Sequence, residues 1–431
     1  MTYNYEDQVQ ALVDYFKSGE KDQNNWKIGV EFEHIIIDEK SLETVSIYGE
    51  NGVSETIGKL EDLGWTIEYF EGYSLGASKG PYTVSTEPAG QFELSIEASK
   101  SIEELERLYI LFLEEVLPLV KDQGQRLVAI GYQPKTKIDE IKISPKKRYG
   151  YMYEHFKTRG KRSHNMMKGT AAVQVIIDYK DEEDFVRKYR LGSYLSPILY
   201  TIFENAYIFE GEPYERHGLR EYIWKNTDPS RSGLLESAFD QDFSYRSYAE
   251  YILNNDVIFL DDDKGLRSTE GKLFKEIFDP DDYTEDEIFH AVSIVFPDIR
   301  LKKYLEYRMM DSLPYPLNFA PVSLIGGIFY SDDNMKALEE AFDRPSFEEI
   351  KAFREETMEK GLEAEFRGRT VKDWGFWLID LAKTSLEPRG KTLLDPLEKH
   401  LTKGLSPRDK FKKIYDEEGL EEAIKIEIVE V

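Results

Sequence analysis

The spacing of apolar side chains divides the chain into helices and strands. Residues 5–18 have the period of an amphipathic helix, and the β-branched run at 27–37 predicts a strand. Ser101 followed by Glu104 has the spacing of a capping box, so a long helix should begin there. The same reasoning predicts strands at about 91–96, 126–132, 170–178 and 302–309, helices at about 101–122 and 183–208, and nearly continuous helix after residue 331.

The order of these elements indicates the class of fold. Strands are scattered among helices without the regular strand–helix–strand alternation that is typical of a parallel sheet. No internal repeat or low-complexity tract is present. We therefore expect an α+β fold with a mainly antiparallel sheet flanked by helices.

Composition and charge narrow the classes of function. The 431 residues carry a formal net charge of -27, which disfavours binding to nucleic acids and to anionic membranes. The chain has no cysteine, so a disulfide, a thiolate metal site and a cysteine nucleophile are excluded. The first residues lack the features of a signal peptide, and no stretch is apolar over the roughly 20 residues that span a bilayer. We expect a soluble, cytoplasmic protein with no nucleic-acid or membrane partner.

Carboxylates interrupt two of the predicted strands. Glu31 and Glu33 lie two residues apart in the first strand, so their side chains point to the same face. A second strand follows the turn around Pro88 and carries Glu93. A solvent-exposed sheet face would explain such residues as well as a binding site would.

Two further strands carry isolated polar groups. Gln174 is the single polar residue in the apolar run 171–177, where a hydrogen-bonded core amide is the alternative explanation. Glu306 and Arg308 share a face of the strand at 302–309. Buried carboxylates are costly unless they are paired or bind cations, and oxygen ligands suit Mg²⁺ or Mn²⁺ rather than zinc. Four such strands, one with an arginine, indicate a metal-dependent phosphoryl-transfer site.

Two other motifs resemble binding sites but do not indicate one. Residues 385–392 end in the Gly-Lys-Thr of a phosphate-binding loop, but Ser385 replaces its first glycine and no strand precedes it. His34 and His164 lack partners at the spacing of zinc ligands, so zinc-dependent hydrolysis is not expected.

Around these strands the sequence resembles the plant-type glutamate–cysteine ligases, which belong with the glutamine synthetase-like carboxylate–amine ligases. The similar stretches follow the order of the family: 29–34, 87–95, 129–135, 166–178, 223–233 and 296–308. The resemblance implies a curved, mainly antiparallel sheet that forms a funnel within a catalytic domain at 1–330. It also implies a helical region at 331–431 packed on that domain.

The resemblance further implies roles for individual residues. Arg308 would stabilise the transferred phosphoryl group, Arg220 would clamp the α-carboxylate of glutamate, and Arg231 would be a second anion contact. The implied metal shell consists of Glu31, Glu33, Glu87, Glu93, Gln174 and Glu306. The implied metal is Mg²⁺ or Mn²⁺, and ATP is the implied co-substrate.

The implied reaction joins the γ-carboxylate of glutamate to the amine of cysteine through a γ-glutamyl phosphate, the first step of glutathione biosynthesis. The partners would be glutamate, cysteine and ATP, in a monomer or a weak homodimer. The matched stretches concern ATP, metal and glutamate more than the amine. Two alternatives therefore stay open: the same activation with a different amine acceptor, and a catalytically silent metabolite-binding protein with this fold.

Overall fold

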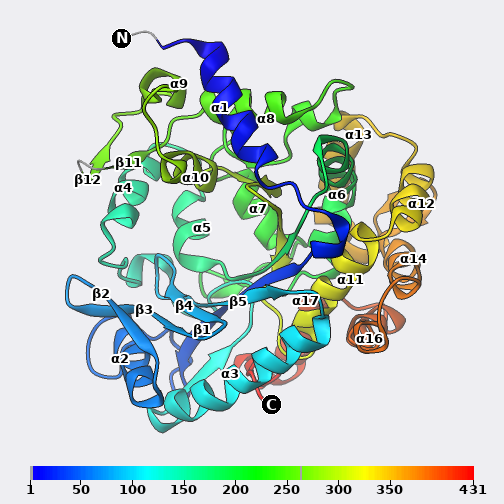
Figure 1. The fold of residues 1–431 in the computed structure, drawn as a ribbon. Helices are drawn as coiled ribbons and strands as arrows, with labels where there is room; N and C mark the ends of the chain where they lie inside the picture. The colour runs from blue at the N-terminus through cyan, green and yellow to red at the C-terminus, as the bar shows by residue number, and fades with distance from the viewer. Residues whose placement is uncertain (1–2, 263–264) are drawn as a thin grey trace.

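A nine-stranded antiparallel sheet forms the centre of the computed structural model, which describes residues 3–262 and 265–431 (Figure 1). Every neighbouring pair within this sheet is antiparallel, which confirms the predicted α+β class. The strands follow the order β14 (Ile299–Leu301), β15 (Leu305–Asp311), β7 (Ala172–Ile177), β1 (Ile28–Asp38), β5 (Phe92–Ser99), β4 (Tyr82–Thr86), β3 (Tyr73–Lys79) and β2 (Thr66–Phe70), and β6 (Gln125–Val128) pairs with the last residues of β1.

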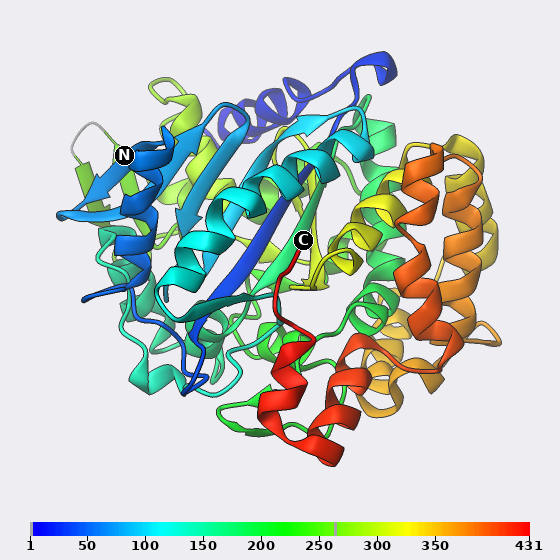
Figure 2. The same ribbon diagram turned by 90° about the horizontal axis from the view of Figure 1, so that it is seen from below.

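The two faces of the central strand β1 differ in character. Phe32 packs on Tyr109 of α3 (Ile102–Asp122) with ring centroids 4.6 Å apart, and His34 Nε2 lies 2.9 Å from the Tyr109 hydroxyl. Because side chains alternate along a strand, Glu31 and Glu33 project to the opposite face. Figure 2 shows α3 lying across the outer face of the sheet, so the two carboxylates point away from it into the molecule.

Helices cover both faces of the sheet. On the outer face, α3 begins as predicted, with Ser101 Oγ accepting a hydrogen bond from the Glu104 amide at 3.3 Å. Phe319, just before α11 (Ala320–Phe329), packs on Phe32 and Tyr109, which places it on the same side. Across the sheet from α3 lie α4 (Lys147–Phe156), α5 (Ser163–Gly169) and α7 (Leu219–Lys225) (Figure 1). These three helices enclose the polar face.

The C-terminal part of the chain is mainly helical and shares the core of the sheet. Phe342 stacks on Trp374 at 4.7 Å and on Tyr194 of α6 (Glu182–Ile202) at 5.8 Å. One hydrophobic core therefore crosses the boundary predicted at residue 330. The elements of this part are α12 (Asp332–Phe342), α13 (Phe347–Lys360), a hairpin of β16 (Glu365–Phe366) and β17 (Arg369–Thr370), α14 (Val371–Lys383), α15 (Pro388–Thr392), α16 (Asp395–Thr402), α17 (Pro407–Glu418) and α18 (Leu420–Lys425).

The structure corrects the predicted elements at three places. The strands β2 to β4, at 66–86, were not predicted, because β2 is largely exposed and shows no clear apolar alternation. The helix predicted at 183–208 ends at Ile202, and the strand predicted at 302–309 is a hairpin with its turn at 302–304. None of the helices in the described residues has the length and apolarity that crossing a membrane requires.

Candidate active site

Three adjacent strands bring four of the predicted ligands to one face. Glu33 of β1 lies directly opposite Glu93 of β5, and Glu31 lies directly opposite Gln174 of β7. Directly opposite residues in antiparallel strands have side chains about 5 Å apart on the same face. The four side chains therefore form one polar cluster on the face turned away from α3.

Hydrogen bonds extend this cluster to β15. Gln174 Nε2 donates to Glu33 Oε1 at 3.0 Å, and the Ala172 amide donates to Glu33 Oε2 at 2.8 Å. Arg308 Nη1 donates to Gln174 Oε1 at 2.5 Å and to Glu306 Oε2 at 3.1 Å. Gln174 is thus no isolated core amide, because it connects a carboxylate of β1 to the arginine of β15.

Glu306 is surrounded by cations. Arg300 of β14 binds it with two hydrogen bonds, at 2.6 Å from Nε to Oε2 and at 3.0 Å from Nη2 to Oε1, and Lys302 Nζ lies 3.7 Å from Oε1. Burial favours the neutral acid, but Arg300, Lys302 and Arg308 outweigh it and hold the pKa of Glu306 well below its usual range. Its two oxygens already accept three hydrogen bonds from the two arginines, which leaves little of their acceptor capacity for a metal.

The other carboxylates of the cluster are partly buried, and nearby cations do not outweigh the effect of burial on them. Burial, reinforced by the nearby Glu87, raises the pKa of Glu33 to about 8. Burial also raises the pKa of Glu31 and of Glu93, and neighbouring glutamates add to both shifts. A divalent cation among these oxygens would favour the charged forms. The donor set therefore fits Mg²⁺ or Mn²⁺, which prefer oxygen ligands.

Glu87 reaches the cluster from a tight turn. The Gly90 amide donates to the Glu87 carbonyl at 3.0 Å, and Gly90 adopts a φ of +88° that favours glycine. A Cβ at Gly90 would also lie 2.8 Å from the side chain of Ile47. The turn leaves the Glu87 carboxylate beside α4, where its Oε1 lies 3.3 Å from the Tyr149 hydroxyl.

Arg220 approaches from the other side, on α7. Its Nε and Nη2 donate to the backbone carbonyl of Arg308 at 3.2 and 3.0 Å. Its Nη1 is buried and has no hydrogen-bond partner in the part of the chain that the structure describes. A buried donor without a partner is uncommon in proteins and indicates a group that a ligand satisfies. One edge of the guanidinium is thus anchored and the other is available.

Arg231 does not fit its predicted role as an anion contact. Its guanidinium is completely buried and donates to the carboxylates of Asp228 and Asp256. It also donates to the backbone carbonyls of Asp256 and Ile294 at 3.0 and 3.1 Å. All its nitrogens are therefore engaged within the protein, and Arg231 holds three segments together instead of contacting a substrate.

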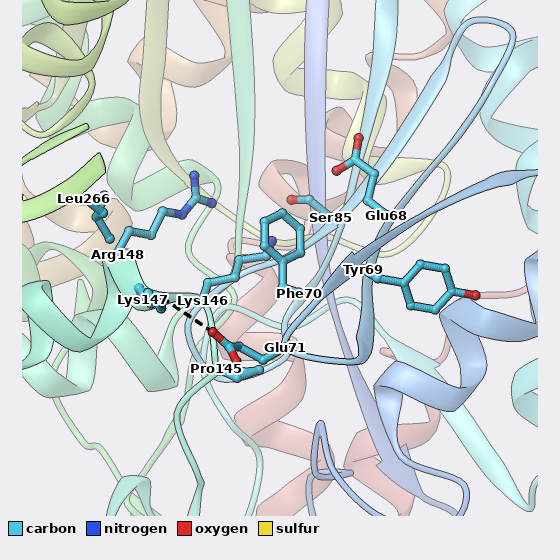
Figure 3. Close-up of a pocket in the computed structure, with 10 residues that line it drawn as sticks. All are labelled: Glu68, Tyr69, Phe70, Glu71, Ser85, Pro145, Lys146, Lys147, Arg148 and Leu266. Carbon is cyan, nitrogen blue, oxygen red and sulfur yellow. Dashed lines mark ion pairs between the residues drawn. The ribbon is translucent and has the colours of Figure 1, made fainter. Parts of the chain in front are cut away.

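A cavity of about 670 Å³ opens at the edge of the cluster (Figure 3). The end of β2 and the turn after it, residues 68–71, form one wall, and the start of α4 with Lys146 and Arg148 forms the other. Ser85 also lines the cavity, and its Oγ donates to Glu93 Oε1 at 3.1 Å. Burial and the adjacent Arg148 lower the pKa of Lys146 to about 8. The cavity thus joins a cationic wall to the carboxylates.

Sequence reasoning missed Arg300, Lys302 and Lys146, and it considered Arg148 only as part of a possible acceptor pocket at 147–152. Arg300 lies directly opposite Glu306 in the β14–β15 hairpin, so a correct hairpin register would have revealed it. Nothing in the local sequence separates Lys146 and Arg148 from ordinary surface cations. They approach the carboxylates only because β2, β4 and α4 meet at the cavity.

The chain is similar to plant enzymes over nearly its whole length. It is 30% identical over 418 residues to glutamate–cysteine ligase A, chloroplastic, of Oryza sativa subsp. japonica, covering 94% of this chain and 84% of that protein. It is 28% identical over 422 residues to the chloroplastic glutamate–cysteine ligase of Arabidopsis thaliana, covering 95% of this chain and 80% of that protein. The crystal structure of the glutamate–cysteine ligase of Francisella tularensis in complex with AMP has a similar fold, with a TM-score of 0.57 and 10% identity over 94% of this chain and 87% of that chain.

A family profile covers the same region. The profile described as glutamate–cysteine ligase family 2 matches residues 27–426. The match includes the strands of the carboxylate cluster, α7 with Arg220 and the C-terminal helices as far as residue 426. The resemblance found in the sequence is confirmed, and this chain belongs to glutamate–cysteine ligase family 2.

Proposed function

We propose that this protein is an ATP-dependent glutamate–cysteine ligase that requires Mg²⁺ or Mn²⁺. The observation that carries the proposal is the partly buried cluster of Glu31, Glu33, Glu93 and Gln174, connected by hydrogen bonds to Arg308. Such a cluster needs cations, and a phosphoryl-transfer reaction needs cations beside an arginine. Family membership supports glutamate as the carboxylate that is activated.

Glutamate binding is assigned to the end of the cluster that holds Arg220. The available Nη1 of Arg220 would bind the α-carboxylate of glutamate, because an arginine edge matches a carboxylate in shape and charge. Its other edge is fixed to the backbone of Arg308, so the clamp keeps a constant position relative to β15. This anchoring would direct the γ-carboxylate of the substrate toward Arg308.

The nucleotide is assigned to the cavity of Figure 3, at the opposite end of the cluster. Its volume of about 670 Å³ suits a ligand the size of a nucleotide. Lys146 and Arg148 would attract the triphosphate. Glu87 and Glu93, beside this cavity, would hold the metal that, when bound, neutralises the triphosphate.

The first chemical step forms an acyl phosphate. An oxygen of the γ-carboxylate attacks the γ-phosphorus of ATP, the bond from that phosphorus to the bridging oxygen breaks, and ADP leaves. Arg308 would donate hydrogen bonds to the oxygens of the transferred phosphoryl group. A donor aimed at developing charge in a buried site contributes about 3–4 kcal/mol to lowering the barrier.

The second step forms the amide. The amine nitrogen of cysteine attacks the γ-carbonyl carbon, the bond from that carbon to the phosphate oxygen breaks, and phosphate leaves. The nitrogen loses a proton, which gives γ-glutamylcysteine. Glutamate held by Arg220 stays in place through both steps, so the reactive acyl phosphate remains bound.

Phosphate release from ATP and glutamate, measured across a series of amines, tests this proposal. We expect cysteine to give the highest kcat/KM and 2-aminobutyrate to react more slowly, because pockets separate such similar shapes by only about 1–3 kcal/mol. A diamine or a bulkier amino acid that exceeds cysteine by more than about tenfold would overturn the acceptor assignment. If none of the amines supports phosphate release, the assignment as a ligase is itself overturned.

A further inference from the structure

A second cavity, of about 750 Å³, is lined by residues 314–317 and by residues of the C-terminal helices, which are distant in sequence from most of the carboxylate cluster. It is formed by α16 and the residues after it, by α17, by the end of α18 and the residues after it, and by residues 314–317, which follow β15. None of the residues that line it belongs to the metal shell, to α7 or to the cavity of Figure 3. It is therefore separate from the proposed active site.

The lining of this cavity is strongly positive in a protein of net charge -27. Five lysines reach it from three segments: Lys399, Lys403, Lys410, Lys413 and Lys425. Only Lys425 has a salt-bridge partner, Glu422, within the residues that the structure describes. By contrast, Arg187, which lines another surface cavity, is paired with Asp332 and Glu339. The lysine charges are thus gathered without being balanced.

The neighbouring titratable groups do not balance them either. His400 lines the cavity, and burial together with Lys410 and Lys403 lowers its pKa to about 4, so it is neutral near pH 7. Burial raises the pKa of Glu427, beneath the cavity, to about 8, which leaves it mostly protonated near pH 7. Glu430 is the one acid among the lining residues, and it cannot offset five lysines.

The geometry restricts the chemistry of a ligand. The lining residues include lysines but no arginine, and a lysine binds phosphate as a point charge without the fixed fork of an arginine. Tyr315, Leu317 and Ile428 add an aromatic and apolar wall. The volume lies within the range of about 300–1,000 Å³ that is usual for small-molecule sites.

We propose that this lysine-lined cavity binds a small molecule that carries an oligophosphate group. Several amino groups around one cavity match several phosphate charges, and the apolar wall has room for a base or another flat group. The negative charge of the ligand would neutralise the lysine charges that the protein leaves unpaired.

Isothermal titration of the whole protein with inorganic tripolyphosphate tests the site. The titration is done in EDTA, because a triphosphate in the proposed nucleotide cavity would be held through a divalent cation. We expect one probe per chain and weaker binding as salt is added. Lys403→Gln with Lys413→Gln should weaken binding by at least about tenfold. The control, Lys121→Gln with Lys336→Gln, changes net charge equally at exposed lysines elsewhere and should stay within about twofold.

ATP titrated under the same conditions separates the possible sources of the phosphate. Tighter binding of ATP than of tripolyphosphate, lost in the Lys403/Lys413 variant, supports a nucleotide, and the reverse order supports an inorganic oligophosphate. The proposal is overturned if the parent protein does not bind tripolyphosphate. It is also overturned if the Lys403/Lys413 variant binds as well as the parent, or if the control loses as much affinity, since net charge alone would then explain the binding.

Discussion

The guanidinium of Arg220 donates two hydrogen bonds to the backbone carbonyl of Arg308, at 3.2 Å from Nε and 3.0 Å from Nη2. This contact joins α7 to the strand whose Arg308 side chain faces the carboxylate cluster. It sets the distance between the proposed glutamate clamp and the proposed phosphoryl-stabilising group, and it leaves Nη1 of Arg220 available for substrate.

Arg220→Lys should weaken glutamate binding specifically. A lysine keeps the charge but cannot anchor to the Arg308 carbonyl and grip a carboxylate at once. We expect KM for glutamate to rise by at least about tenfold, with KM for ATP changed by less than about threefold. Steady-state kinetics with each substrate varied in turn measures both. An unchanged KM for glutamate would show that Arg220 has a purely structural role.

Arg308→Lys should act on turnover more than on binding. The substitution removes the bonds to Gln174 and Glu306 and the donors aimed at the transferred phosphoryl group. We expect kcat to fall by about 10²–10³, with a smaller change in KM for ATP. If only KM for ATP rises, Arg308 binds the ground state and the role assigned to it is incorrect.

Stability should depend on metal and pH together. Without a divalent cation the pKa of Glu33 is raised to about 8, so the free energy of unfolding falls as pH rises from the unfolded pKa through that value. A bound cation favours the ionised carboxylates and removes this loss. Mg²⁺ should therefore raise Tm more at about pH 8 than at about pH 6.

Two variants control that measurement. Glu33→Gln should remove most of the pH dependence of the Mg²⁺ effect, whereas Glu43→Gln, at an exposed position after β1, should leave it unchanged. Equal Mg²⁺ stabilisation at both pH values in the parent protein would argue against a metal site at Glu33.

Arg354 should be essential for stability, because it connects the C-terminal helices to the active-site elements. From α13 it donates to Glu221 of α7 and, at 2.8 Å, to Asp298, whose carbonyl accepts the Arg308 amide. Arg354→Met leaves two buried acids unpaired and should lower the free energy of unfolding by about 3–5 kcal/mol. Arg367→Met, which removes a partly exposed pair with Glu349, should cost no more than about 1 kcal/mol. Urea unfolding of both variants measures these free energies. Equal losses of stability in the two variants would contradict the role assigned to Arg354.

The sequence was informative where strand alternation decides the direction of a side chain. Phe32 and His34 had to face the apolar helix α3, so Glu31 and Glu33 had to face the other way. Gln174 could be placed on β7 but not assigned its partners, because its bonds to Glu33 and Arg308 depend on the order of three strands.

Long-range pairing could not be predicted from local patterns. The resemblance implied that Arg231 contacts an anion, yet Asp256, 25 residues further along the chain, pairs with its guanidinium inside the protein. The strands β2 to β4 were missed because β2 is exposed, although the end of β2 and the turn after it provide one wall of the cavity in Figure 3.

Oxygen transfer from glutamate to phosphate is the most direct test of the central claim. Glutamate labelled with ¹⁸O in its γ-carboxylate is incubated with ATP, cysteine, Mg²⁺ and the protein, and the released phosphate is analysed by mass spectrometry. Attack by the γ-carboxylate on ATP, followed by breakage of the acyl carbon–oxygen bond, predicts one ¹⁸O atom in each phosphate released. Phosphate without ¹⁸O, released while γ-glutamylcysteine or any other amide accumulates, would contradict the acyl-phosphate mechanism.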